Sequence, residues 1–116
     1  MSETHERIHG MVNQYPVILF MKGTPDEPRC GFSSRVAMIL KDTNKPFAAF
    51  DVLSDPTIRQ GIKEYGNWPT IPQLYVKGEL VGGSDIISEM FISGELKTLL
   101  DSADGAPDTE SEAPES

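Results

Sequence analysis

The sequence predicts an α/β domain in which helices cover both faces of a four-stranded mixed sheet. Residues 17–21 form an uninterrupted apolar run of strand length, which is typical of a central strand covered on both faces. Segments with helical periodicity alternate with strand-like runs around it. Further along, a turn at Lys77 and Gly78 separates two short strand-like runs, which indicates an antiparallel hairpin.

Helices and strands are expected to alternate in the first half of the chain. The expected elements are a helix at residues 3–15, a strand at 17–21, a helix at 31–41 and a strand at 47–52. The second helix has apolar residues recurring on one face, namely Phe32, Val36, Ile39 and Leu40. Because a helix connects the two strands, these should be parallel and joined by a right-handed crossover.

The second half of the chain begins with a clear helix start. Ser54 and Asp55 supply capping side chains, and Pro56 suits the first helical position of a helix that ends at Gly66. The remaining expected elements are hairpin strands at 73–76 and 79–81, a helix capped by Ser84 and Asp85, and a last short helix at 94–100. This order is the thioredoxin arrangement, an α/β sandwich with about five helices around a four-stranded mixed sheet.

The acidic charge is concentrated at the C-terminal end. The chain has a net charge of −8, but residues 104–116 hold five carboxylates and no Lys or Arg. The remaining residues carry 13 acidic and 10 basic side chains, so residues 1–103 are expected to form a nearly neutral domain. Residues 104–116 are expected to be a disordered acidic tail. A nucleic-acid-binding protein would need a basic stripe, which the sequence lacks.

Cysteine content and hydropathy predict a cytoplasmic protein. One cysteine excludes an intramolecular disulfide, which fits a reducing compartment. No apolar run approaches the length of a membrane span, so no membrane partner is expected. The first residues are polar and acidic, unlike the basic and then apolar start of a signal peptide.

Cys30 lies at the start of the second helix, after the central strand. A thiol at the first turn of a helix faces unpaired backbone N–H groups and the positive end of the helix dipole, which lower its pKa. Lys22 and Arg29 bring further positive charge nearby. The alternative is a small, buried and unreactive cysteine, which is the commoner state of a lone cysteine in a soluble protein. The residue context favours a reactive thiol.

Several motifs occur together in a fixed order along the chain. These are Met21-Lys22-Gly23, Cys30-Gly31-Phe32-Ser33, Trp68-Pro69-Thr70-Ile71-Pro72 and Val81-Gly82-Gly83-Ser84-Asp85-Ile86. With them, residues 5 to 102 resemble a monothiol glutaredoxin of the C-G-F-S class, most of all the short single-domain bacterial form. The agreement of several motifs makes this resemblance far more specific than a C-x-x-S pattern alone.

The resemblance implies a glutathione site and assigns a role to each of its residues. Lys22 and Arg59 would hold the glycyl carboxylate of glutathione. The backbone of Ile71 would pair with its cysteinyl segment. The backbone N–H groups of Ser84 and Asp85 would receive the γ-glutamyl carboxylate, and the Asp85 side chain would receive the ammonium group. A carboxylate met by cations or by a helix N-terminus is physically favourable.

Two further features follow from the resemblance. It implies a cis peptide bond before Pro72, which the residues alone leave open between cis and trans. Many relatives also carry a second cysteine where this chain has Ser84, so a disulfide between that position and Cys30 is impossible here.

Two chemistries from different classes compete for this thiol. The resemblance implies a [2Fe-2S] cluster, glutathione as co-ligand, a cluster-bridged homodimer, pairing with BolA-like proteins and cluster transfer to apo iron–sulfur proteins. In that reading Cys30 is both the metal ligand and the catalytic residue, and the main function is iron–sulfur cluster assembly. The alternative is a glutathione-dependent oxidoreductase that works with one cysteine, because Ser33 cannot resolve a disulfide. A third reading, a redox-sensing cysteine, leaves Lys22, Arg59 and Asp85 without a joint purpose.

Overall fold

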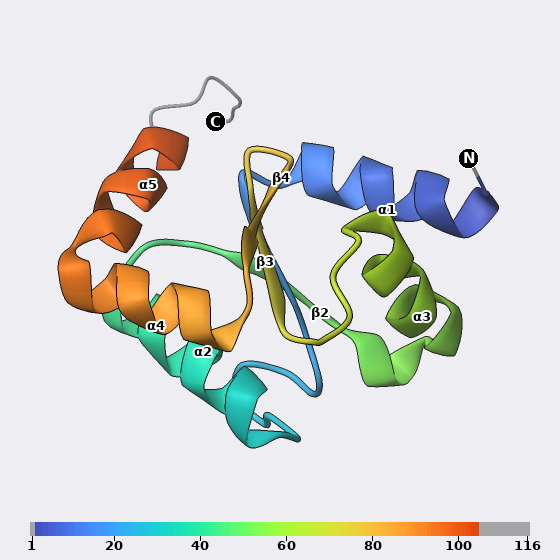
Figure 1. The fold of residues 1–116 in the computed structure, drawn as a ribbon, viewed down its shortest axis with the longest axis horizontal. Helices are drawn as coiled ribbons and strands as arrows, with labels where there is room; N and C mark the ends of the chain where they lie inside the picture. The colour runs from blue at the N-terminus through green and yellow to red at the C-terminus, as the bar shows by residue number, and fades with distance from the viewer. Residues whose placement is uncertain (1, 105–116) are drawn as a thin grey trace.

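A computed structural model describes residues 2–104, in which helices flank a four-stranded sheet (Figure 1). The helices are α1 (Glu3–Gln14), α2 (Gly31–Asp42), α3 (Pro56–Tyr65), α4 (Ser84–Ser93) and α5 (Glu95–Asp104), with a short 3-10 helix at Val52–Ser54. The strands are β1 (Val17–Met21), β2 (Ala48–Asp51), β3 (Gln73–Val76) and β4 (Glu79–Gly82). The predicted acidic tail lies, apart from Asp104, outside the described residues.

The sheet has the strand order β2-β1-β3-β4. β1 pairs with β2 in parallel, as the intervening helix α2 requires, and with β3 antiparallel. β3 and β4 form the antiparallel hairpin that the turn residues predicted. The four-stranded mixed sheet is therefore confirmed, with β1 as one of its two central strands.

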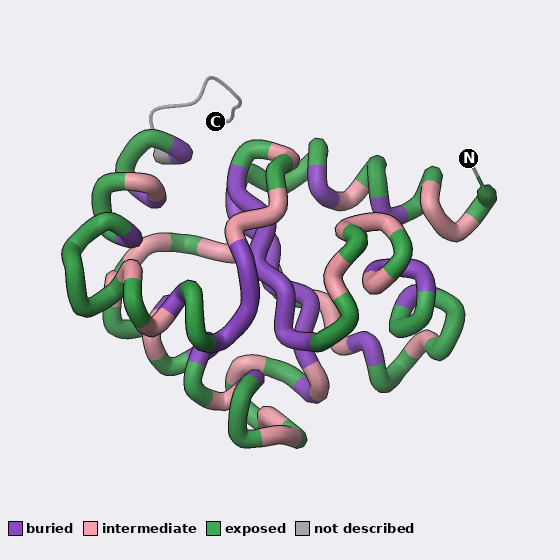
Figure 2. Tube along the Cα trace, in the orientation of Figure 1, coloured by how far each residue is buried: buried purple, intermediate pink, exposed green. Residues whose placement is uncertain are grey.

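The two faces of β1 explain why its sequence is apolar throughout. Figure 1 shows α1 and α3 on one side of the sheet and α2, α4 and α5 on the other. Alternate residues of a strand point to opposite faces of the sheet. Because helices cover both faces, all β1 side chains are buried. Figure 2 shows the central strands buried along their length. Ile18 and Phe20 belong to the cluster under α1 and α3. The other three β1 residues face the opposite cluster.

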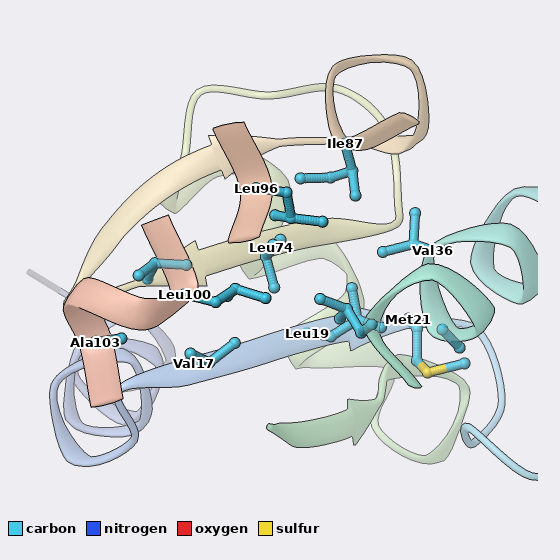
Figure 3. Close-up of a cluster of buried hydrophobic side chains, with 12 residues drawn as sticks. Val17, Leu19, Met21, Val36, Leu74, Ile87, Leu96, Leu100 and Ala103 are labelled. Atoms are coloured by element: carbon cyan, nitrogen blue, oxygen red, sulfur yellow. The ribbon is translucent and has the colours of Figure 1, made fainter. Parts of the chain in front are cut away.

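The larger core cluster lies between the sheet and the α2, α4 and α5 helices. Leu74 of β3 meets Leu96 and Leu100 of α5 there, and all three are essentially fully buried (Figure 3). The cluster as a whole consists of Val17, Leu19, Met21, Val36, Ala37, Leu40, Leu74, Val76, Ile87, Leu96, Leu100 and Ala103. This core fixes α2 and α4, the two helices whose N-terminal ends carry Cys30 and Ser84.

Some sequence-based expectations differ from the structure in their details. The strand expected at 47–52 ends at Asp51, because Val52 already starts the 3-10 helix, and the last helix continues beyond residue 100 to Asp104. Ser84 is the first residue of α4 and not its cap. Phe32, expected on the core face of α2, has 62% of its surface exposed, because the first turn of α2 extends past the core.

Candidate functional site

Cys30 is the N-cap residue of α2, so its side chain lies at the open end of the helix. Its Sγ accepts a hydrogen bond from the backbone N–H of Ser33 at 3.4 Å, and the hydroxyl of Ser33 lies 3.7 Å from the same sulfur. The backbone N–H of Lys22 donates to that hydroxyl oxygen at 3.0 Å. This contact leaves the hydroxyl proton of the fully buried Ser33 free to turn towards an ionised sulfur.

These contacts decide the ionisation of the thiol. Burial raises the pKa of the Cys30 thiol, but the opposing effects outweigh it. The Ser33 backbone N–H and hydroxyl, the Phe32 backbone N–H and the charge of Lys22 all favour the thiolate, so the pKa of Cys30 lies below its ordinary value. Cys30 is also partly exposed. The prediction of a reactive thiol is therefore supported over that of a buried, unreactive one.

The loop between β1 and α2 leads to Cys30, and backbone contacts join its two ends. The backbone N–H of Arg29 donates to the carbonyl of Lys22 at 2.9 Å, and Gly23 forms an isolated bridge with Pro28. Gly23 N–H in turn donates to a carboxylate oxygen of Asp51 at 2.9 Å, which ties the loop to the end of β2. The segment between Lys22 and Cys30 is thus held at both ends.

A groove of about 230 Å³ lies next to the thiol-bearing end of α2. It is lined by Phe32, Trp68, Thr70, Ile71, Pro72, Gly83, Ser84, Asp85 and Ile86. These residues come from the start of α2, the segment before β3 and the start of α4. The volume is several times what one water molecule occupies, so the groove has room for a small organic ligand.

The α4 end of the groove is suited to a carboxylate. Gly83 caps α4 without a side-chain hydrogen bond, so the first backbone N–H groups of the helix are not taken up by a capping side chain, while Asp85 places a carboxylate in the first turn. The hydroxyl of Ser84 is buried and has no hydrogen-bond partner among residues 2–104. The N-terminal end of α4 is therefore the feature of this groove that favours an anionic group.

Comparison with known proteins agrees with this geometry. The glutaredoxin family model matches residues 17–81, which include β1, Cys30 and the groove-lining residues before β3, but not those at the start of α4. A monothiol glutaredoxin of Synechocystis, described as ycf64-like, is 55% identical over 101 residues, which is 87% of this chain and 94% of that protein. The chain belongs to the glutaredoxin family. High-identity relatives named monothiol glutaredoxins place it in the single-cysteine branch.

Other relatives and solved structures extend the comparison. The monothiol glutaredoxin-S11 of rice is 58% identical over 95 residues, or 82% of this chain. The chain spans only about a fifth of the length of the plant relatives it matches. The solution structure of reduced poplar apo GrxS14 has a TM-score of 0.74 at 48% identity, covering 84% of this chain and 90% of that one. A buckwheat glutaredoxin–glutathione complex has a TM-score of 0.78 at 20% identity, covering 90% and 93%, and shows the shared fold.

The predicted site residues of this glutaredoxin lie in three places. Ile71, Ser84 and Asp85 line the groove together. The charge of Lys22 lowers the pKa of Cys30, and the Lys22 carbonyl accepts the backbone hydrogen bond from Arg29 that closes the loop before Cys30. Arg59 lies exposed on α3, and among the described residues no side-chain hydrogen bond or ion pair joins it to the groove. The expected cis bond between Ile71 and Pro72 is confirmed.

Sequence reasoning missed some residues that shape the site. Phe32 was expected on the core face of its helix, yet it lines the groove and is largely exposed, and Ile86, which is 37% exposed, lines the groove as well. The direct contact between Ser33 and the Cys30 sulfur was also missed. The N-cap position of Cys30 could have suggested this contact, because a capping side chain accepts a hydrogen bond from the backbone N–H two or three residues further on.

Among the described residues, none of the helices is long and apolar enough to cross a bilayer.

The neighbouring serines allow a test of the Cys30 environment. Ser33→Ala should raise the pKa of Cys30, because the hydroxyl that favours the thiolate is removed. Ser34→Ala is the matched control, since the Ser34 hydroxyl contacts only the Met38 sulfur, at 4.0 Å, among the contacts described. Thiolate absorbance near 240 nm across a pH titration measures both variants. An unchanged Cys30 pKa in Ser33→Ala would contradict this description of the thiol.

Proposed function

We propose that this glutaredoxin carries a [2Fe-2S] cluster in iron–sulfur cluster assembly and transfer, and that it holds the cluster jointly with glutathione in a homodimer. The observation that carries the proposal is a lone, partly exposed thiol of lowered pKa beside a groove that includes a helix N-terminus without a side-chain cap. A thiolate is the form that ligates iron. A groove able to fix a second thiol-bearing molecule next to it completes the ligand set.

The donor set of one chain is too small for a cluster. A [2Fe-2S] cluster commonly takes four thiolate ligands, and the chain has one cysteine. Among residues 2–104, no group of three or more His, Cys, Asp or Glu side chains is arranged to hold a metal. Two chains with two bound glutathiones supply four thiolates, so the residues fit a shared cluster and not one held by a single chain.

Glutathione fits the chemistry of the groove, and the buckwheat glutaredoxin of the same fold was solved in complex with it. We assign its γ-glutamyl carboxylate to the backbone N–H groups of Ser84 and Asp85 and its ammonium to the Asp85 carboxylate. The Ile71 backbone, next to the cis bond, would pair with the cysteinyl segment. Lys22 and Arg59 would hold the glycyl carboxylate.

The protein residues have distinct tasks in this mechanism. Cys30 presents its thiolate as a ligand to the cargo cluster. The Ser33 N–H stabilises the negative sulfur without competing for iron. The groove orients glutathione so that its thiol lies beside Cys30. Because each contact to the tripeptide is non-covalent, the assembly can come apart when the cluster is transferred to an apo-protein.

The proposed partners follow from this reading. Apo iron–sulfur proteins receive the cluster, and a BolA-like protein can replace one chain by providing its own ligand in place of one Cys30. A thiol ligand without a disulfide partner suits a reducing environment, so we place the protein in the cytoplasm.

A second candidate function is removal of glutathione from mixed disulfides, which the lowered pKa of Cys30 favours. The Cys30 thiolate would attack the glutathionyl sulfur, break the disulfide and release the other thiolate. A second glutathione thiolate would then attack the Cys30–glutathione disulfide, which regenerates Cys30 and yields glutathione disulfide. Both functions use the same groove.

Anaerobic reconstitution tests the proposal. Protein treated with ferrous iron, sulfide and reduced glutathione should become coloured and elute as a dimer, whereas omission of glutathione should leave a colourless monomer. A colourless monomer under both conditions would contradict the carrier function. Fast reduction of a small glutathione mixed disulfide by the same sample would favour the second candidate.

The two cations should affect cluster retention through glutathione. Lys22→Ala or Arg59→Ala should weaken glutathione binding by about tenfold, because each removes a charge-assisted hydrogen bond worth roughly 1.5 kcal/mol. Cluster absorbance should fall at low glutathione and recover with excess glutathione. Lys97→Ala, on the exposed surface of α5, is the control. Equal retention in all three variants would show that neither cation contacts glutathione.

A further inference from the structure

Gln73 is a polar side chain buried completely within the sheet. It is the first residue of β3 and directly follows the cis bond between Ile71 and Pro72. None of its surface is exposed. Burying an amide is unfavourable unless its hydrogen bonds are made, so its contacts determine what it does.

The Gln73 amide joins the sheet to the segment before it. Its Nε2 donates to the backbone carbonyl of Trp68 at 3.1 Å and to that of Thr70 at 3.2 Å. Its Oε1 accepts from the hydroxyl of Tyr75 at 3.0 Å. One side chain therefore makes three hydrogen bonds, two of them to the backbone of the segment that leads to Pro72.

Only one orientation of this amide is possible. Carbonyl oxygens cannot donate, so the NH₂ group must face Trp68 and Thr70, and the amide oxygen must face Tyr75. Burial, with the nearby Tyr65 hydroxyl, raises the pKa of the Tyr75 phenol far above its ordinary value, so this hydroxyl stays protonated and remains a donor. The donor and acceptor roles in all three hydrogen bonds of the Gln73 amide are therefore fixed.

The two carbonyls that Gln73 holds belong to one wall of the groove. Trp68 and Thr70 both line it, as do Ser84 and Asp85 at the start of α4. The α4 side also constrains this segment, because a Cβ on Gly83 would lie 3.1 Å from the Pro72 carbonyl and 3.4 Å from Trp68 Nε1. The width of the groove therefore depends on where Gln73 holds Trp68 and Thr70.

We propose that Gln73 is a positioning residue for glutathione, which fixes the Trp68–Thr70 wall at the distance from α4 that the tripeptide requires. The inference rests on the proposed function, since it needs glutathione in this groove. It adds a residue that does not itself touch the ligand. Cys30 makes no contact with this amide among the described hydrogen bonds, so thiol reactivity and ligand affinity should separate.

The single tryptophan makes the test direct, because Trp68 lies in the groove and reports on it by fluorescence. Reduced glutathione is titrated into the wild type, Gln73→Met, Gln73→Glu, Tyr75→Phe and the control Gln14→Glu. Gln14 is an exposed residue at the end of α1, so it carries the same chemical change away from the groove. Circular dichroism confirms folding, and thiolate absorbance gives the Cys30 pKa in each variant.

Gln73→Met keeps the size of the side chain but loses all three hydrogen bonds, and it should weaken glutathione binding by about fivefold or more at every pH. Gln73→Glu should behave differently. Its carboxylate would face two carbonyl oxygens, so binding relative to the wild type should worsen as the pH rises and the carboxyl ionises. The Cys30 pKa should be unchanged in both variants. Ionisation of a buried carboxyl also lowers the free energy of unfolding, so circular dichroism at each pH has to show that Gln73→Glu is still folded where its binding is lost.

Each outcome decides one of the two proposals. If the wild type does not bind glutathione, the proposed function fails and this inference fails with it. If the wild type and Gln14→Glu bind but Gln73→Met binds equally well, only the positioning role is wrong. Should the Gln73 variants not fold, Tyr75→Phe decides, because it leaves the amide oxygen without its donor. It should weaken binding by about twofold to threefold, and unchanged binding would overturn the inference.

Discussion

Cys30→Ser should abolish cluster binding and glutathione transfer completely, while the fold remains intact. A serine hydroxyl does not ionise near neutral pH, so it offers neither an iron ligand nor a nucleophile for a disulfide. Serine is, however, a favoured N-cap residue, and Cys30 caps α2. The free energy of unfolding should therefore be unchanged or slightly raised, and the loss of function cannot be attributed to unfolding.

Visible absorbance after reconstitution and a mixed-disulfide reduction assay measure the two losses, with chemical denaturation as the check on stability. Ser33→Ala is the matched control, because it alters the environment of the sulfur without removing it, and it should retain the colour. A coloured dimer formed by Cys30→Ser would show that the cluster is held elsewhere.

Gly23→Ala should destabilise the protein by about 2 kcal/mol or more, because the loop that delivers Cys30 depends on this glycine. Gly23 has φ +92°, a backbone conformation that residues with a side chain rarely adopt. An added Cβ would lie 2.5 Å from the carbonyl oxygen of Glu27 and 2.7 Å from the backbone nitrogen of Arg29. Both contacts are with backbone, so relief requires the loop to open. The Cys30 environment should change with it.

Gly10→Ala is the control for this variant and should have the opposite sign. Gly10 lies within α1, and no atom would come within 4 Å of an added Cβ. Alanine is a better helix former than glycine, so the change should stabilise by about 0.5–1 kcal/mol. Urea denaturation of both variants measures the difference. Equal stabilities would mean that the loop does not need the glycine conformation.

The fold was predictable from sequence because its signals are periodic. The run from Val17 to Met21 is apolar throughout, and the structure explains this by helices on both sides of β1. The helix start at Asp55 and Pro56 was equally clear, because capping chemistry is local. Such features depend on residues close together in the chain.

Features that depend on where an element ends were less predictable. Phe32 shares a helical face with Val36, but the core covers Val36 and leaves Phe32 exposed. Helical periodicity identifies the apolar face of a helix, but it does not show how much of the helix length the core covers. Ser84 was expected to cap α4, whereas Gly83 takes that position and the buried Ser84 hydroxyl has no hydrogen-bond partner in the described part of the chain.

The candidate site was predictable in part. The sequence located Cys30 at a helix N-terminus, but the contacts of Ser33 with its sulfur emerged only from the structure. Gln73 gave no signal, because a polar residue at the start of a strand can be exposed as readily as buried. The role of Arg59 stays a prediction from the family resemblance, since its side chain is exposed on α3.

The composition of the loaded protein tests the central claim most directly. Native mass spectrometry of the reconstituted sample gives the number of chains, glutathiones, iron and sulfide in one species. We predict two chains, two glutathiones and one [2Fe-2S] cluster, because one cysteine per chain leaves half of the thiolate ligands to glutathione. A cluster bound to a single chain, or to two chains without glutathione, would contradict the account.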